Sequence, residues 1–187
     1  MKAVTNVVGF DDAPFAHEHR GDVRVVGAVC SRTRLDGVLS GKVRRDGRNA
    51  TDTLIELVRG GKFREHVRGV LLQGIALAGF NVVDLHRLSE TLDVPVVVAV
   101  RRHPRLPMVE EALRTRTPGG LRKWRLVQAA GPLTHIGALW VQHIGIDRDG
   151  AAALLAATTL HGNLPEPLRL AHLIAGGVTT GQSRGRA

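Results

Sequence analysis

The stretch RGVLLQGIALAGFNVVDLHRLSETLDVPVVVAV, residues 68–100, decides the fold of this chain. Residues 68–78 form an almost continuous apolar run, which predicts a buried strand. Residues 82–91 repeat apolar side chains at helical spacing, and VPVVVAV at 94–100 predicts a second buried strand. A strand, a helix and a strand within about 30 residues form a βαβ unit. We therefore expect the two strands to be parallel.

Three strands are predicted before this unit, at 3–10, 23–31 and 38–44. Their connections are short, which favours an antiparallel meander, and a helix is expected to begin near Asp52. The later elements are expected to be a strand at 136–144 and helices at 107–115, around 121–129, at 148–160 and at 167–175. Three antiparallel strands, a helix and a βαβ unit follow the order of a ribonuclease H-like α/β fold, a mixed sheet flanked by helices.

The length of 187 residues fits one domain with a full core. Aromatic residues make up only 3% of the chain, so we expect a core of Val, Leu, Ile and Ala. The domain is predicted to span 1–176. The last segment, 177–187, is rich in Gly and polar residues and is predicted to be a flexible tail.

The charge balance favours a polyanionic partner. Lys and Arg number 26 against 17 Asp and Glu, which gives a net charge of +9 and a pI near 11.2. The alternative explanation for this excess of basic residues is a GC-rich genome, whose codons favour Arg. The most basic stretch is 101–128, where we expect contacts to DNA or RNA from Arg102, Arg105, Arg122 and Lys123. Trp124 lies within it, either as a stacking surface for a base or as a core anchor.

Cysteine usage and the N-terminus bear on the compartment. Cys30 is the one cysteine, so a disulfide within the chain is excluded and a reducing compartment is favoured. The first residues lack the pattern of a signal peptide, and no apolar run reaches the length of a membrane span. We expect a cytoplasmic protein without membrane association.

Two adjacent carboxylates, Asp11 and Asp12, end the first strand. A carboxylate at that position can hold Mg²⁺, which prefers oxygen ligands. Neighbouring side chains on a strand point to opposite faces, so we favour Asp11 as the ligand. Asp12 either contacts nucleic acid or begins an Asx turn.

Several other polar residues have two interpretations, one functional and one structural. Asp46 and Asp52 either contribute to a metal site or form a turn and a helix start. Gln73 is either a ligand or a polar residue paired within the sheet, and His143 is either a catalyst or a core histidine. Asn81 either contacts nucleic acid or caps the next helix.

The chain resembles the endonuclease dU family in four segments that cover nearly its whole length. They are GFDDAPF at 9–15, DGRNAT at 46–51, QGIALAGFNVVDL at 73–85 and HGNLPEPLRLAHLIA at 161–175. The resemblance implies activity on DNA with deaminated bases, deoxyuridine first. We expect the last segment to fix the start of the final helix.

A wider resemblance links the chain to endonuclease V. Gly9-Phe10-Asp11 is similar to its Gly-x-Asp motif, Arg101 falls at a basic position after a strand, and His143 falls near a Gly-His pattern. This family carries three acidic metal ligands, which the resemblance maps to Asp11, Asp52 and Gln73. Gln73 is not a carboxylate, and one hypothesis is that Asp46 or Asp84 compensates.

These observations predict a nuclease that uses Mg²⁺ or Mn²⁺ to hydrolyse a phosphodiester near a deaminated base. Asp11 and Asp52 would hold the metal, Arg101 would neutralise a phosphate, and His143 would orient water or protonate the leaving group. Two alternatives stay open: a non-catalytic nucleic-acid binder, which the loss of charge at Gln73 favours, and a nuclease for inosine in RNA.

Overall fold

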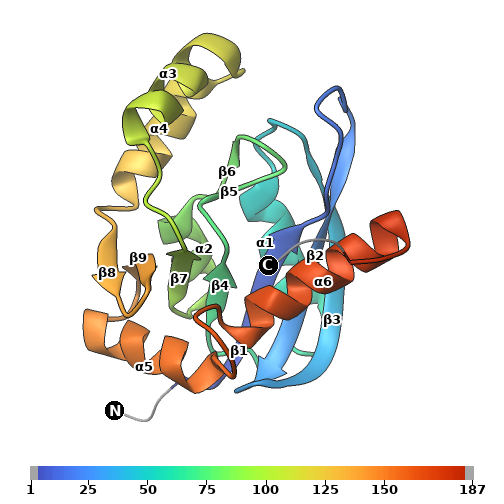
Figure 1. Ribbon diagram of the computed structural model, residues 1–187, viewed down its shortest axis with the longest axis vertical. Coiled ribbons are helices and arrows are strands. Elements are labelled where there is room, and N and C mark those ends of the chain that lie inside the picture. Colours follow the sequence, from blue (N-terminus) through green and yellow to red (C-terminus); the bar gives the residue numbers. More distant parts are fainter. Residues whose placement is uncertain (1–3, 184–187) are drawn as a thin grey trace.

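The computed structural model describes residues 4–183 and contains one seven-stranded sheet with helices on both faces (Figure 1). The strand order is β3-β2-β1-β4-β7-β9-β8. The strands are β1 (Asn6–Asp12), β2 (Asp22–Ser31), β3 (Arg34–Arg44), β4 (Val70–Leu72), β7 (Val96–Val100), β8 (Thr134–Ile136) and β9 (Leu139–Ile144). The helices are α1 (Ala50–Gly60), α2 (Leu85–Leu92), α3 (Leu106–Arg116), α4 (Gly120–Ala129), α5 (Arg148–Thr158) and α6 (Glu166–Thr180).

The pairing of the strands confirms the predicted mixed sheet. β1, β2 and β3 form an antiparallel meander, while β4 lies parallel to both β1 and β7. At the far edge β9 pairs antiparallel with β7 and with β8. The carboxyl ends of β1, β4 and β7 therefore lie along one edge of the sheet, which is where α/β folds commonly place their sites.

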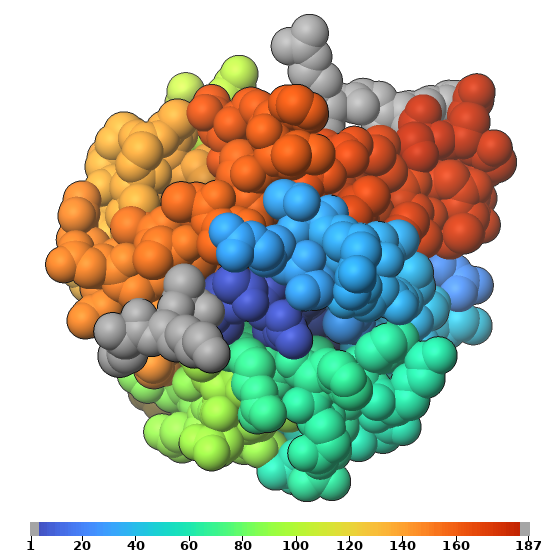
Figure 2. Space-filling view, turned by 90° about the horizontal axis from the view of Figure 1, so that it is seen from below, coloured from blue at the N-terminus to red at the C-terminus, as the bar shows by residue number. Residues whose placement is uncertain are grey.

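Alternating residues of β1 face the two helical layers. Val8 and Phe10 are fully buried in a cluster with Leu54 of α1 and Leu88 of α2. The other face of β1 meets α6: a Cβ added at Gly9 would lie 2.5 Å from the Pro167 carbonyl carbon. Figure 2 looks at the end where β1 starts and shows the strands between α5 and α6 on one side and the segments around α1 and α2 on the other.

Three predicted elements differ from the structure. The strand expected over 136–144 is interrupted by a turn at Gly137, which takes a φ of +59°, so Ile136 ends β8 and β9 begins at Leu139. The strand expected over 68–78 ends at Leu72, because Gly74 takes a φ of +98° and the chain turns away. The following residues pair instead as the short strands β5 (Ala76–Leu77) and β6 (Asn81–Val82).

The tail prediction also needs correction. Helix α6 continues past Gly176 and Gly177 to Thr180 and ends where Gly181 adopts a left-handed φ of +81°. Gly176 is buried, so packing offsets the low helix propensity of glycine. The rest of the predicted tail, 184–187, lies outside the described residues.

Helices α3 and α4 stand beyond the main body as a hairpin (Figure 1). They pack mainly on each other through Leu113 and Val127, and they reach the body through Val82 of β6. Within residues 4–183, we find no helix of the length and apolar character that crossing a membrane requires.

Candidate active site

A cleft of about 580 Å³ opens at the carboxyl end of β1. Its volume is within the range of small-molecule sites. Side chains from β1, from the loop after it, from the end of β4 and from α6 line it: Asp11, Asp12, Ala13, Pro14, Phe15, Gln73, His172, Gly176 and Thr180. The cleft thus brings Asp11, Asp12 and Gln73, three of the predicted site residues, together.

Asp11 is the most buried carboxylate of the cleft, with 8% of its surface exposed. Its Oδ2 lies 2.8 Å from Nδ1 of His172, and its Oδ1 accepts the Asp12 backbone N–H at 3.0 Å. Burial raises the pKa of Asp11, and the contact with His172 opposes that rise. Asp11 is therefore a buried group that gains from a cationic partner, as a metal-binding carboxylate does.

Asp12 points toward the loop that follows β5. Its Oδ2 accepts the backbone N–H of Ala78 at 2.9 Å. Burial and the neighbouring charge of Asp11 raise the pKa of Asp12 to about 6, while the Ala78 hydrogen bond opposes the rise. Both carboxylates line the cleft, so the charge repulsion between them is part of the site.

Gln73 lines this cleft and carries an oxygen that has no hydrogen-bond donor. Phe10 pairs with Leu72 in the parallel register of β1 and β4, so the next residues along, Asp11 and Gln73, are neighbours. The Gln73 Oε1 atom is buried and has no hydrogen-bond donor. A buried acceptor without a donor costs about 1–3 kcal/mol, and a cation in the cleft would satisfy it.

The donor set fits a hard divalent cation. Two carboxylates and an amide oxygen match the preference of Mg²⁺ and Mn²⁺ for oxygen. Mg²⁺ commonly binds through one or two carboxylates, with waters and substrate phosphates completing its shell. Across the described part of the chain, no three His, Cys, Asp or Glu side chains form a metal-binding group. Gln73 is therefore needed for a three-donor site here.

Asp52 lies away from the cleft. It is on α1, which packs on the Phe10 face of β1, and its carboxylate pairs with Arg87 of α2. Asp84 caps α2 by accepting the Arg87 backbone N–H at 3.0 Å. The structure therefore places neither residue beside Asp11, and both act at helix starts or between helices.

Asp46 holds the same loop as Asp12. Its Oδ1 accepts the Phe80 N–H at 2.8 Å, and its carboxylate lies 3.3 Å from Nε of Arg45. Asp46 does not line the cleft, but its neighbour Arg45 contacts the loop after β1. The structure therefore gives Asp46 a role in loop packing.

Asn81 is fully buried, and both ends of its amide are used. Its Nδ2 donates to the Arg44 carbonyl and to Asn49 Oδ1, each at 2.8 Å, and its Oδ1 accepts the Ala50 N–H at 3.0 Å. These bonds join the end of β3 to the start of α1. The prediction that Asn81 contacts nucleic acid is wrong, because the side chain is not accessible.

His143 and Arg101 occupy different positions along the sheet. His143 is on β9, three strands from β1, which at the usual strand spacing is about 14 Å. Its Nδ1 lies 2.8 Å from the Ile146 carbonyl. Arg101 is exposed and directly follows β7, at the same edge of the sheet as Asp11. The structure therefore keeps Arg101 as a phosphate-binding candidate and does not bring His143 to the cleft.

The predicted basic contacts lie on and beside the α3–α4 hairpin. Arg102, Arg105 and Arg122 are exposed. Lys123 is 3% exposed and donates to the Asp46 carbonyl at 2.6 Å, and Trp124 packs partly buried in the hairpin cluster. The three arginines are accessible to a nucleic-acid backbone, whereas the structure favours the core-anchor reading of Trp124.

His172 is a site residue that the residue patterns did not single out. It is 161 positions from Asp11 in sequence, and only the packing of α6 on β1 brings the two together. Glu166, in the same segment, is buried and bonded to Arg169 through both oxygens at 2.9 and 2.7 Å. His172 continues the three-residue spacing of Glu166 and Arg169 along α6, and this spacing on one side of the helix was the available signal.

The fold and the cleft define the class: an α/β domain with the fold of endonuclease V. The crystal structure of human endonuclease V matches with a TM-score of 0.56 at 18% identity, over 92% of this chain and 83% of that one. Endonuclease V of Bacillus subtilis matches with a TM-score of 0.58 at 12% identity, over 95% and 82%.

The sequence matches the family described as Endonuclease dU over residues 3–179, and the chain belongs to that family. A UPF0215 protein of Deinococcus radiodurans is 54% identical over 98% of this chain and 93% of its own length. The crystal structure of a protein of unknown function from Archaeoglobus fulgidus matches with a TM-score of 0.87 at 35% identity, over 93% of this chain and 98% of that one. Family and fold together support a nuclease-like function.

Proposed function

We propose that this chain is a divalent-metal-dependent endonuclease that hydrolyses a phosphodiester near a deaminated base, with deoxyuridine in DNA as the leading substrate. The observation that carries the proposal is the donor-free Oε1 of Gln73 beside Asp11 in an open cleft. Family membership supports the substrate, and a related endonuclease V was crystallised with DNA containing inosine.

Asp11 and Gln73, with Asp12 at their side, would hold Mg²⁺ or Mn²⁺. When bound, such an ion supplies Lewis-acid stabilisation of the phosphate and a more acidic water. The Asp52 side chain is left out of this ligand set, because it is paired with Arg87 on another face.

The protein's own groups would set the geometry around that site. His172 donates to Asp11 and so fixes the orientation of its carboxylate. Arg101 lies at the same edge and would bind a phosphate of the strand, since a guanidinium presents paired N–H donors that match phosphate oxygens. The exposed arginines of the α3–α4 hairpin would follow the backbone further along.

The test is cleavage of labelled oligonucleotides that carry uracil, hypoxanthine or no lesion, as DNA and as RNA. We expect product from uracil DNA with Mg²⁺ or Mn²⁺ and none with a chelator. Asp11→Asn should remove cleavage while the melting temperature stays close to that of the wild type. Asp36→Asn is the matched control, because Asp36 pairs with Arg34 away from this cleft. Cleavage retained in Asp11→Asn would take Asp11 out of the site.

One observation favours a second candidate, a binder without catalysis. Glutamine adds no negative charge where endonuclease V, by the resemblance, has an acidic ligand, and a weaker metal site can leave binding intact. This alternative predicts salt-sensitive binding of every oligonucleotide in the panel and no product with either metal.

A further inference from the structure

Among the described residues that line the Asp11 cleft, Phe15 carries the one phenyl ring, and the other ring is the imidazole of His172, which is bonded to Asp11. The chain has four Phe, two Trp and no Tyr, so an aromatic side chain at this position is uncommon in its composition. Phe15 is half-buried at the cleft wall, four residues after Asp11. A flat apolar ring beside a phosphate-type site is the arrangement on which a nucleobase stacks.

Arg45 holds the loop that carries this ring. Its Nη1 donates to the His17 carbonyl and, at 2.5 Å, to the His19 carbonyl. Its guanidinium carbon lies 5.4 Å from the centre of the Phe15 ring. The Arg45 side chain is only 13% exposed. This contact is therefore built into the packing between β3 and the β1–β2 loop.

We propose that Phe15 is the stacking platform for a nucleobase in the Asp11 cleft and that Arg45 is its positioning residue. The proposal rests on the proposed function, since it assigns a substrate contact within that site. A deaminated base pairs less well than the base it replaces, so it leaves a duplex at lower cost. Phe15 would hold such a base while Asp11 and Gln73 face the phosphate.

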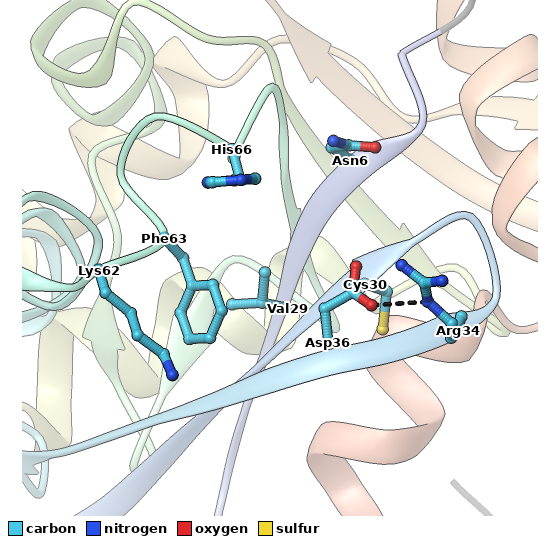
Figure 3. Close-up of a pocket in the computed structure, with 8 residues that line it drawn as sticks. All are labelled: Asn6, Val29, Cys30, Arg34, Asp36, Lys62, Phe63 and His66. Atoms are coloured by element: carbon cyan, nitrogen blue, oxygen red, sulfur yellow. Dashed lines mark hydrogen bonds and ion pairs between the residues drawn. The ribbon is translucent and has the colours of Figure 1, made fainter.

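A second cation–ring pair in the same molecule provides a matched control. Lys62 lies 5.0 Å from the centre of the Phe63 ring, in a separate pocket of about 310 Å³. Figure 3 shows this pocket, where Phe63 and Lys62 lie across from Asp36 and Arg34. It also includes Asn6, at the start of β1, whereas the Asp11 cleft is at the end of that strand.

The experiment measures equilibrium binding in chelator, so that no strand is cut. Two labelled single strands are compared: one with a central uracil and one with an abasic analogue at that position. Phe15→Leu keeps apolar volume but has no ring, and Phe15→Tyr keeps the ring. Phe63→Leu makes the same change in the separate pocket.

We expect Phe15→Leu to weaken binding of the uracil strand by about 5-fold to 150-fold, as loss of one base–aromatic stack does. Binding of the abasic strand should not change, and Phe15→Tyr should restore the preference for uracil. Phe63→Leu should leave both affinities as in the wild type. As a single change, Arg45→Met should reduce the preference for the uracil strand over the abasic strand. Added to Phe15→Leu, it should not change this preference further, because Arg45 acts through the Phe15 ring.

Equal weakening of both strands, or none, would overturn the stacking role. A wild-type protein that does not prefer uracil over the abasic strand would overturn it as well. These outcomes are distinct from failure of the proposed function. A protein that binds uracil selectively but never cuts would refute the nuclease and keep the platform. A protein that cuts with Mg²⁺ but shows no preference for the uracil strand would refute the platform and keep the nuclease.

Discussion

Replacing Asp12 by Asn should stabilise the protein at neutral pH. The Asp12 carboxyl has a pKa of about 6 in the folded protein against 3.8 for an unperturbed group, because it is buried beside Asp11. At 1.36 kcal/mol per unit, ionising Asp12 in the folded state costs about 3 kcal/mol. Asparagine is isosteric and keeps an oxygen to accept the Ala78 N–H. It should therefore recover about 1–3 kcal/mol of this cost.

The sign of the pH dependence follows from the raised pKa. Between pH 4 and 6 the folded state holds a proton on Asp12 that the unfolded state has released, so stability falls as pH rises through this window. Above about pH 6 Asp12 is ionised in both states, so the destabilisation of the folded state reaches its full value. Because the neighbouring Asp11 also has a raised pKa, the useful quantity is the difference in free energy of unfolding between wild type and Asp12→Asn.

Urea denaturation in chelator at pH 4, 5, 6, 7 and 8 measures this difference as a free energy of unfolding. It should be near zero at pH 4 and largest at pH 7 and 8. A variant that is no more stable than wild type at pH 8 would refute the reasoning, as would a difference that does not vary with pH. Added Mg²⁺ should stabilise wild type more than the variant, since Asp12 lies beside the proposed ligands.

Two further changes test the architecture and the donor set. Asn81→Ala should destabilise the protein by about 1–3 kcal/mol, because it leaves the Ala50 N–H without its buried acceptor, while the Arg44 carbonyl keeps the Gly47 N–H as a donor; a loss below about 0.5 kcal/mol in urea would contradict this. Gln73→Glu should lower stability in chelator and tighten Mn²⁺ binding at least about tenfold, since a unit charge a few ångströms from a cation is worth several kcal/mol in a half-buried site. Calorimetric titration with Mn²⁺ measures this affinity, and an unchanged value would remove Gln73 from the ligand shell.

The βαβ unit and the meander were predictable because buried strands and amphipathic helices leave strong local patterns. Asp11 was predictable for a similar reason: a carboxylate that ends the first strand has few alternatives to a site at that edge. For Gln73 the residue pattern left two roles open, and only the resemblance aligned it with a metal ligand, since nothing local distinguishes an amide that faces a cleft from one paired within the sheet.

The remaining residues depended on packing between distant segments. His172 reaches Asp11 only because Gly9 lets α6 lie against β1. The hydrogen bonds of Asn81 connect β6 to the start of α1 and the end of β3, which lie 31 and 37 positions away, and no local pattern encodes them. Asp52 was assigned by spacing from a family motif, and spacing does not determine which face of the sheet a helix covers.

The position of α6 has a consequence for biosynthesis. Asp11 is synthesised 161 residues before its partner His172. In a nascent chain still attached to the ribosome, Asp11 is already present long before α6 can dock beside Gly9. Products of premature termination or of C-terminal proteolysis before residue 166 would also lack α6. If the site cuts nucleic acid as proposed, copies that stop before α6 would not cut, because the cleft is complete only once α6 has docked.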